Sequence, residues 1–271
     1  LVSYAHYYVG EAEGRRNLCG ESEKMGVLSN KINREDLKPG DHIYSWRYSY
    51  LYAHHGIYMG EEKVIHFTRG AGHEIGTGTP LDNIIFSSPP SRPPADPCPK
   101  CGDQSSSFGV ISSCIDCFVY GGDLYLFEYG VSYVFFLAKT RGGTCTLAPS
   151  DPPEDVLHRA SYLLQHGFGG YNLFKNNCED FAIYCKTGYL VFTSNSVGRS
   201  GQAASIVAAF SAAVSSPLRF LTNSAGGVAV LGYGLYCAGR LVSDIGIRRD
   251  VAKVPVERLT APVCSDENLS L

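Results

Sequence analysis

The sequence predicts an α+β protein in which an antiparallel sheet packs on helices. Three short runs rich in β-branched and aromatic residues are separated by turn residues, as in consecutive hairpins. Two later segments place apolar residues at helical spacing and end in glycine. The expected strands cover residues 42–46, 52–59 and 63–68, and the expected helices cover 151–167 and 176–188.

Composition narrows the class of protein. The chain has 271 residues, of which 44% are hydrophobic and 18% charged, which suits a folded protein of one or two domains. A net charge of −3 offers no electrostatic footprint for nucleic acid. The ten cysteines are unevenly placed, and residues 1–24 contain no apolar run of the kind found in a secretory signal. We therefore expect a reducing, intracellular setting.

Residues 1–35 are expected to form a disordered extension, because this stretch is polar and lacks periodicity. Two interpretations of Met25 remain open. If it is a start residue, Gly26 is a candidate for myristoylation, with Asn30 where the usual pattern has Ser or Thr. Otherwise Met25 is an ordinary internal residue.

The second and third expected strands carry three histidines. Alternation along residues 52–59 puts His54 and Gly56 on one face and His55 on the other. His66 lies on the adjacent strand, where a cross-strand neighbour comes within about 5 Å at Cβ. His54 is therefore a candidate general base, with His66 as the group that orients its ring. The alternative is that each histidine is an ordinary sheet residue.

Residues 87–122 are expected to form an insertion that begins with a Pro-rich link. It carries two Cys-x2-Cys pairs, and the glycine after the first pair suits the tight turn of a zinc knuckle. Four thiolates on one Zn²⁺ would make a structural site with no position open for catalysis. Two local disulfides or redox-active pairs are the alternatives, and we expect the insertion to staple a loop. The candidate ligands are Cys98, Cys101, Cys114 and Cys117.

Two further strands are expected over residues 124–129 and 133–138, because both runs are aromatic and apolar. A helix follows them. Asp151 is its expected N-cap, Pro152 its first residue and Gly167 its end.

The segment 176–188 brings a thiol to the start of a helix. Cys178 falls in the first turn, where unpaired N–H groups and the helix dipole favour a thiolate. Such positions, with a histidine nearby, lower a thiol pKa from about 8.5 to roughly 3.5–7.5. Cys178 is therefore a candidate nucleophile, or else a buried cysteine of an ordinary amphipathic helix.

Four motifs in this order resemble the lecithin:retinol acyltransferase (LRAT) family. That family is a circularly permuted relative of the NlpC/P60 papain-like hydrolases, with histidine before cysteine in the chain. The resemblance covers roughly residues 36–82 and 123–188. The motifs are Leu37-Lys38-Pro39-Gly40-Asp41-His42-Ile43-Tyr44, His54-His55-Gly56-Ile57-Tyr58, Val64-Ile65-His66-Phe67 and Asn177-Cys178-Glu179.

The resemblance implies a permuted papain-like catalytic domain over residues 36–188. It makes Cys178 the nucleophile, His54 the first histidine and His66 the second. The register to Gly56 selects His54 over the neighbouring histidine. The family's histidine after Asn-Cys-Glu is Asp180 here, a departure outside the triad that we expect to affect substrate more than chemistry.

The region 196–243 is rich in Ala, Gly and Ser and contains two apolar pieces, 203–214 and 225–239. Neither reaches the ~20 residues that span a bilayer simply. Arginines after the second piece suit an anionic lipid surface. The region is expected to form either a membrane-dipping helical hairpin or two Ala-rich helices packed on the core or a partner. Family members often carry a C-terminal apolar anchor, which favours the membrane. Residues 250–271 are expected to be a loose tail.

The resemblance implies a thiol-dependent acyltransferase or phospholipase A-type hydrolase. Its substrate would be an acyl ester of a glycerophospholipid, its intermediate a cysteine acyl-enzyme and its partner a membrane surface, with no cofactor for catalysis. Two alternatives stay open: a cysteine hydrolase of amide or isopeptide bonds, and a non-enzymatic membrane-associated scaffold.

Overall fold

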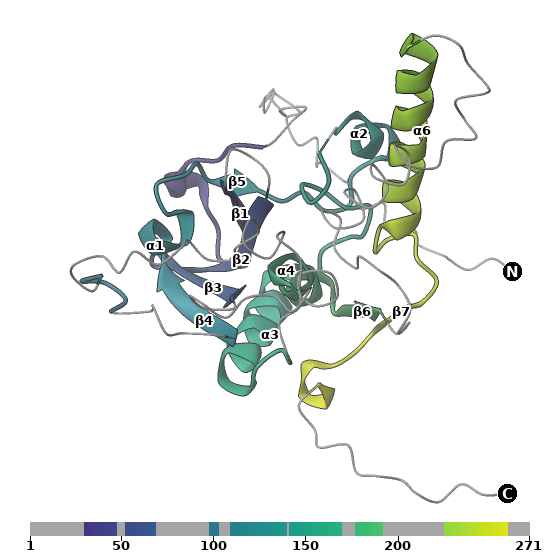
Figure 1. Ribbon diagram of the computed structural model, residues 1–271. Helices are drawn as coiled ribbons and strands as arrows, with labels where there is room; N and C mark the ends of the chain where they lie inside the picture. The colour runs from purple at the N-terminus through teal and green to yellow at the C-terminus, as the bar shows by residue number, and fades with distance from the viewer. Residues whose placement is uncertain are drawn as a thin grey trace, which may run out of the picture.

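The structure is a computed structural model. It describes residues 30–47, 52–68, 98–102, 109–139, 141–169, 177–191 and 225–259. Its centre is a five-stranded antiparallel sheet in the order β4-β3-β2-β1-β5 (Figure 1). The strands are β1 His42–Arg47, β2 Tyr52–Gly60, β3 Lys63–Thr68, β4 Gly109–Cys114 and β5 Tyr125–Leu126. The predicted α+β class and antiparallel sheet are confirmed.

Helices surround this sheet, and a two-stranded sheet stands apart from it. The α-helices are α1 Ile115–Val119, α2 Tyr133–Ala138, α3 Pro153–His166, α4 Cys178–Thr187 and α6 Ala225–Ser243. The small sheet pairs β6 Tyr189–Val191 with β7 Val251–Lys253, and the 3-10 helices are Arg34–Asp36 and Val256–Arg258.

The two faces of the sheet pack on different helices. Ile57, Ile65 and Phe67 point to one face, where they join buried residues of α3 and α4 in one core cluster. These two helices lie side by side in Figure 1. Ile43 and Val64 point to the other face and pack with buried residues of α1. Strand alternation thus distributes apolar side chains to two cores.

Gly56 has a packing reason to be glycine. A Cβ added there would lie 2.7 Å from Val64 Cγ1 and 2.9 Å from Phe118 Cε2, both too close. Gly56 pairs directly with His66 on β3. The missing side chain therefore lets Val64, Phe118 and His66 pack closely over the backbone at this position.

The Cys-rich insertion is part of the main fold. Its second half supplies the edge strand β4, which pairs with β3 from Lys63–Cys114 to Thr68–Gly109. It also supplies α1, whose Phe118 is 1% exposed. The expectation that the insertion only staples a loop is therefore wrong, because its apolar residues complete one of the two cores.

Residues 133–138 are the helix α2, so the strand predicted there is wrong. The Ser132 side chain accepts a hydrogen bond from the Phe135 N–H at 3.2 Å and caps the helix. Only Phe136 of this helix is buried, while Val134 is 80% exposed. A local cap and one-sided burial outweigh the strand preference of aromatic residues. The strand expected over 124–129 shortens to β5.

Helix α3 begins one residue later than predicted. Its N-cap is Pro152, and Asp151 instead forms ion pairs with Arg159 at 2.7 Å and Lys253 at 2.5 Å. Gly167 ends the helix with φ 85°, as predicted.

Residues 30–36 and 251–258 are more ordered than expected. Ile32 N–H donates to Leu124 O at 3.1 Å and Leu126 N–H to Asn30 O at 2.8 Å, so residues 30–32 lie along β5 and are followed by the 3-10 helix Arg34–Asp36. Val256 is 2% exposed and joins the core under α3. The expectations of disorder over 30–35 and of a loose tail over 251–258 are wrong; Met25, Gly26 and residues 260–271 lie outside the described residues.

The second apolar piece of the C-terminal region forms α6, whereas residues 203–214 lie outside the described residues. Tyr233 hydroxyl donates to Leu137 O at 3.2 Å, which joins α6 to α2. Arg240 packs its guanidinium 4.6 Å from the centre of the Phe136 ring. Within the described part of the chain, no helix combines the length and apolar character needed to cross a bilayer.

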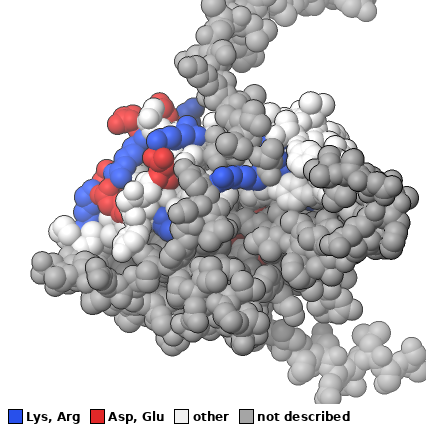
Figure 2. Space-filling view, turned by 45° about the horizontal axis from the view of Figure 1, so that its top comes forward, with Lys and Arg blue, Asp and Glu red and all other residues white. Residues whose placement is uncertain are grey.

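Charged side chains gather on one side of the molecule in Figure 2, with blue and red interspersed. Exposed ion pairs among the described residues include Lys31 with Asp123 at 2.7 Å and Arg34 with Asp116 at 2.7 Å. Alternating signs are typical of a solvated face.

Candidate active site

Cys178 is the first residue of α4. Asn177 caps the helix: its side-chain oxygen accepts from the N–H of Glu179 at 2.9 Å and of Asp180 at 3.1 Å. The Asp180 carboxylate accepts the Asn177 N–H at 3.0 Å, which completes a capping box. Gly188 ends the helix in the left-handed conformation. The predicted position of Cys178 in the first turn is therefore confirmed.

The Cys178 thiol is buried against strand β2. It is 0% exposed, and Sγ donates to the Ala53 carbonyl oxygen at 3.8 Å. Because the amide nitrogen of His54 is bonded to the same carbonyl carbon, the sulfur lies at most about 6 Å from that nitrogen. The structure thus brings the helix start beside the residue that precedes the candidate base.

The sulfur reaches β2 near its beginning. Pairing of β2 with β3 extends only as far as Gly56 and His66, whereas β3 continues with β4 to Thr68. On its other side β2 pairs with β1, where Ala53 lies opposite Trp46. The first turn of α4 approaches this end of the strand.

The two candidate histidines are in contact. His54 Nε2 lies 2.9 Å from His66 Nδ1, and the rings meet edge to face. They are diagonal neighbours, since the residue directly opposite His66 is Gly56. His66 Nε2 in turn lies 2.6 Å from Ser113 Oγ on β4. The other ring nitrogen, His54 Nδ1, is buried and has no hydrogen-bond partner within the described structure.

Burial keeps both rings neutral. Desolvation, then the charges of His66 and Arg47, lower the pKa of His54 well below its usual value. Desolvation and the Arg47 charge lower the pKa of His66 to about 3. Arg47 is itself held on this face by the Val119 carbonyl at 2.7 Å. The His54 ring also packs on Phe118 of α1 at 5.3 Å, so it lies on the α1 face of the sheet. A neutral imidazole with an open nitrogen can act as a base.

A second buried histidine pair occupies the opposite face. His42 Nε2 lies 2.8 Å from His55 Nδ1, and His42 Nδ1 lies 2.7 Å from the Tyr129 hydroxyl. Both ring nitrogens of His42 are thus engaged. Burial lowers the pKa of His55 to about 3.

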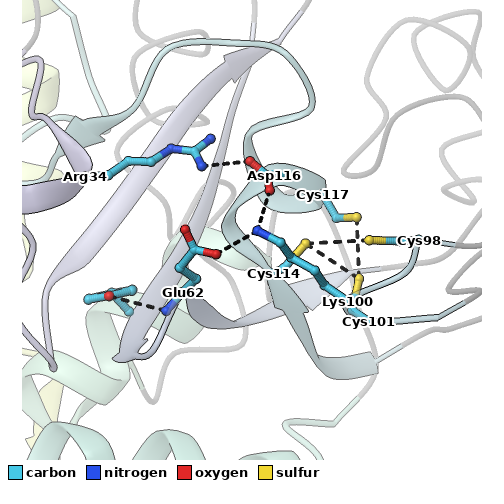
Figure 3. Close-up of polar contacts among 9 residues, drawn as sticks. Arg34, Glu62, Cys98, Lys100, Cys101, Cys114, Asp116 and Cys117 are labelled. Atoms are coloured by element: carbon cyan, nitrogen blue, oxygen red, sulfur yellow. Dashed lines mark hydrogen bonds and ion pairs between the residues drawn. The ribbon is translucent and has the colours of Figure 1, made fainter.

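The four predicted cysteine ligands converge on one point (Figure 3). All four Sγ atoms lie within 4.8 Å of one another, and each of these cysteines is free. Four sulfurs at about 2.3 Å from a tetrahedral Zn²⁺ would be about 3.8 Å apart. The Cys98–Cys114 and Cys101–Cys114 distances are both 3.8 Å, and Cys101–Cys117 is 3.4 Å. These distances fit a metal site and exceed those of disulfide bonds.

Local backbone geometry forms this cluster. Gly102 N–H donates to Cys98 O at 2.8 Å, and Gly102 has φ 73°, which confirms the predicted tight turn. Backbone N–H groups of this turn lower the pKa of the Cys98 thiol to about 6. Lys100 bridges Glu62 at 2.7 Å and Asp116 at 3.0 Å, so the turn is tied to the β2–β3 hairpin and to α1.

Sequence reasoning missed some residues of the site. Ser113 lies on a strand that was not predicted, and a lone serine carries no signal. Ala53 acts through its carbonyl, which side-chain patterns do not report. Asp180, expected to affect substrate, completes the helix cap, and the spacing Asn177-x-x-Asp180 was available to predict that.

A pocket of about 60 Å³ lies beside the first turns of α4. Glu179 and Ile183 line it from α4, Phe136 from α2 and Arg240 from α6. The pocket thus connects the surroundings of the candidate nucleophile with the C-terminal helix.

Two comparisons identify the family of the chain. The family model for lecithin retinol acyltransferase matches residues 35–191. The chain is also 58% identical over 242 residues to Protein LEAD-SENSITIVE 1 of Arabidopsis thaliana, covering 89% of this chain and 93% of the relative. The family match spans the strands that hold His54 and His66 and the helix that starts at Cys178. The chain belongs to the lecithin retinol acyltransferase family.

Proposed function

We propose that this protein is a thiol-dependent acyltransferase or phospholipase A-type hydrolase. Its substrate is an acyl ester of a glycerophospholipid, and its intermediate is an acyl-enzyme on Cys178. One observation carries the proposal. The thiol at the start of α4 lies against the residue before His54, whose Nδ1 is buried with no hydrogen-bond partner in the described part of the chain.

The proposed reaction uses three side chains. His54 Nδ1 takes the thiol proton as the Cys178 sulfur bonds to the ester carbonyl carbon. The Cys178 backbone N–H stabilises the oxyanion. The bond to the glycerol oxygen then breaks, and that oxygen takes the proton from His54. Water, an amine or an alcohol attacks the thioester and regenerates the thiol. His66 holds the His54 ring through the 2.9 Å contact.

Exposed apolar side chains support action at a membrane surface. Helices α2 and α6 lie side by side in Figure 1, and Tyr233 bonds across them. Val134 is 80% exposed, Val230 75% and Val242 67%. Because the thiol is 0% exposed, a substrate reaches it only after covering atoms move. Contact of this apolar surface with lipid would place the acyl chain beside the site.

The four-cysteine cluster is proposed to hold a structural Zn²⁺. Its sulfur distances match a tetrahedral thiolate site, and four protein ligands leave no position for a substrate. The ion would neutralise the thiolates and link the Cys98 turn to the end of β4. No catalytic step depends on it directly.

The test is acyl transfer from phosphatidylcholine vesicles to the protein. The wild type should acquire one acyl mass on the peptide containing Cys178 and release fatty acid, whereas Cys178→Ala should do neither. Cys185→Ala is the matched control, because Cys185 is buried on the same helix and should leave both signals unchanged. Equal acyl release by the wild type and Cys178→Ala would reject the proposal. Turnover of amide substrates without lipid turnover would favour an amide or isopeptide hydrolase.

A further inference from the structure

Ser113 ends a line of hydrogen-bonded side chains that runs across three strands. Its Oγ lies 2.6 Å from His66 Nε2, and His66 Nδ1 lies 2.9 Å from His54 Nε2. Ser113 is 3% exposed, His66 6% and His54 2%, so water is largely excluded from the line. The remaining nitrogen of His54 is the one proposed to meet the thiol.

The sheet register explains why these three side chains line up. His66 pairs with Ile111 on β4, and Ser113 lies two residues further along that strand. On the other side His66 pairs with Gly56, and His54 lies two residues away. Steps of two residues keep side chains on one face, so the line is a diagonal across β2, β3 and β4.

The proton positions along this line are linked. A neutral imidazole carries one ring proton. If His54 Nδ1 is to accept the thiol proton, the ring proton of His54 must sit on Nε2 and be donated to His66 Nδ1. His66 must then carry its proton on Nε2 and donate it to Ser113 Oγ. A Ser113 hydroxyl that donated instead would reverse both rings and leave a hydrogen on His54 Nδ1.

We propose that Ser113 is a positioning residue whose oxygen accepts the His66 Nε2–H and thereby keeps His54 in the tautomer with an open Nδ1. We also propose that the metal bound at the adjacent four-cysteine cluster holds Ser113 in place. Both parts rest on the proposed role of His54.

Connectivity supports the metal's part in this proposal. Cys114 directly follows Ser113 and closes the β3–β4 ladder opposite Lys63. Its sulfur lies 3.8 Å from both Cys98 and Cys101 of the knuckle turn. β4 is an edge strand, so its end has a strand neighbour on one side only. A metal that binds Cys114 would therefore anchor the end of the strand that carries Ser113.

The experiment compares full-length, Zn²⁺-loaded wild type with Ser113→Ala, Ser113→Thr and the matched control Ser112→Ala. Ser112 is the neighbouring serine, and its side chain points to the opposite face. The first readout is the ring ¹⁵N chemical shifts of His66, which identify its tautomer. The second readout is the rate of Cys178 alkylation by iodoacetamide.

The wild type and Ser112→Ala should carry the His66 proton on Nε2. Ser113→Ala should show a mixture of tautomers, and its alkylation rate should fall roughly fivefold to tenfold, the effect of losing one buried hydrogen bond. Ser113→Thr should restore both readouts. Removing Zn²⁺ from the wild type with a chelator should reproduce the Ser113→Ala result, and chelation should add no further loss to Ser113→Ala.

Wild-type tautomer and rate in Ser113→Ala would overturn the role of Ser113. An unchanged rate after chelation of the wild type would overturn the role of the metal. Neither readout requires an acyl substrate. Normal Ser113 effects without an acyl-enzyme would therefore reject only the proposed function, and a normal acyl-enzyme in Ser113→Ala with unchanged tautomer would reject only this inference.

Discussion

The two faces of the central sheet each carry a buried histidine pair. The pairs differ in whether the ring nitrogen that points away from the pair has a hydrogen-bond partner. His54 Nε2 and His66 Nδ1 are 2.9 Å apart, and His42 Nε2 and His55 Nδ1 are 2.8 Å apart. The His42 pair ends at the Tyr129 hydroxyl, so both nitrogens of His42 are engaged. The His54 pair ends at a ring nitrogen that bonds to no described residue.

This difference is the reason for proposing one pair, and not the other, as the source of the base. All four rings are buried, and burial lowers the pKa of each. Burial and pKa therefore do not distinguish the pairs. The His42 ring stacks on Phe127 at 4.3 Å, as in a packed neutral network that stabilises a core. The open nitrogen is the feature that makes His54 the proposed base.

The largest expected effect separates His54 from His55. In His54→Gln the rate of acyl-enzyme formation and of Cys178 alkylation should fall by roughly 10²–10⁴-fold, because general-base catalysis is lost. In His55→Gln the folded protein should retain nearly the wild-type rate, because His55 is not the proposed base and points away from the His54–His66 pair. Stopped-flow alkylation on the folded fraction measures both. A comparable loss of rate in His55→Gln would contradict the assignment of His54, and not His55, as the base.

Acid should destabilise both pairs together. Their pKa values are lowered from about 6.5, to about 3 for His55 and His66, so between these values the unfolded chain binds more protons than the folded one. The stability that depends on these neutral histidines is therefore fully present above about pH 6.5 and is lost as the pH falls towards 3. The loss approaches about 1.4 kcal/mol per pH unit for each histidine.

Urea unfolding at pH 7.5, 6.0 and 5.0 measures this dependence. His55→Gln removes one titrating ring. The unfolding free energy of this variant should therefore fall less steeply with decreasing pH, because one proton fewer is bound on unfolding. An unchanged slope in this variant would mean that His55 does not stay neutral in the fold.

Much of this arrangement was predictable because it depends on local pattern. Alternation placed His54 and His55 on opposite faces, and polar residues before an apolar run placed Cys178 in the first turn of a helix. The glycine after Cys101 predicted the knuckle turn. Each of these follows from neighbours within a few residues.

The rest depends on contacts between distant segments. β3 ends at Thr68 and β4 begins at Gly109, so the two strands are not joined by a short hairpin turn. No local pattern therefore indicated that Ser113 would contact His66. The run 133–138 has strand composition but forms a helix, because Ser132 caps it and its partners lie on α6. Tertiary context decided both outcomes.

The smallest expected effect concerns the hydrogen bond between Tyr129 and the His42–His55 pair. Tyr129→Phe removes the hydroxyl that lies 2.7 Å from His42 Nδ1 and leaves that nitrogen buried without this partner. The loss of one buried hydrogen bond should cost about 1 kcal/mol of unfolding free energy. Cys178 alkylation should stay at the wild-type rate, because the proposed base is His54, which points to the opposite face of the sheet from His42. Urea unfolding and alkylation of the same preparation measure the two quantities. A slower alkylation with unchanged stability would show that the two pairs are coupled through the sheet, and that an open nitrogen alone does not define the site.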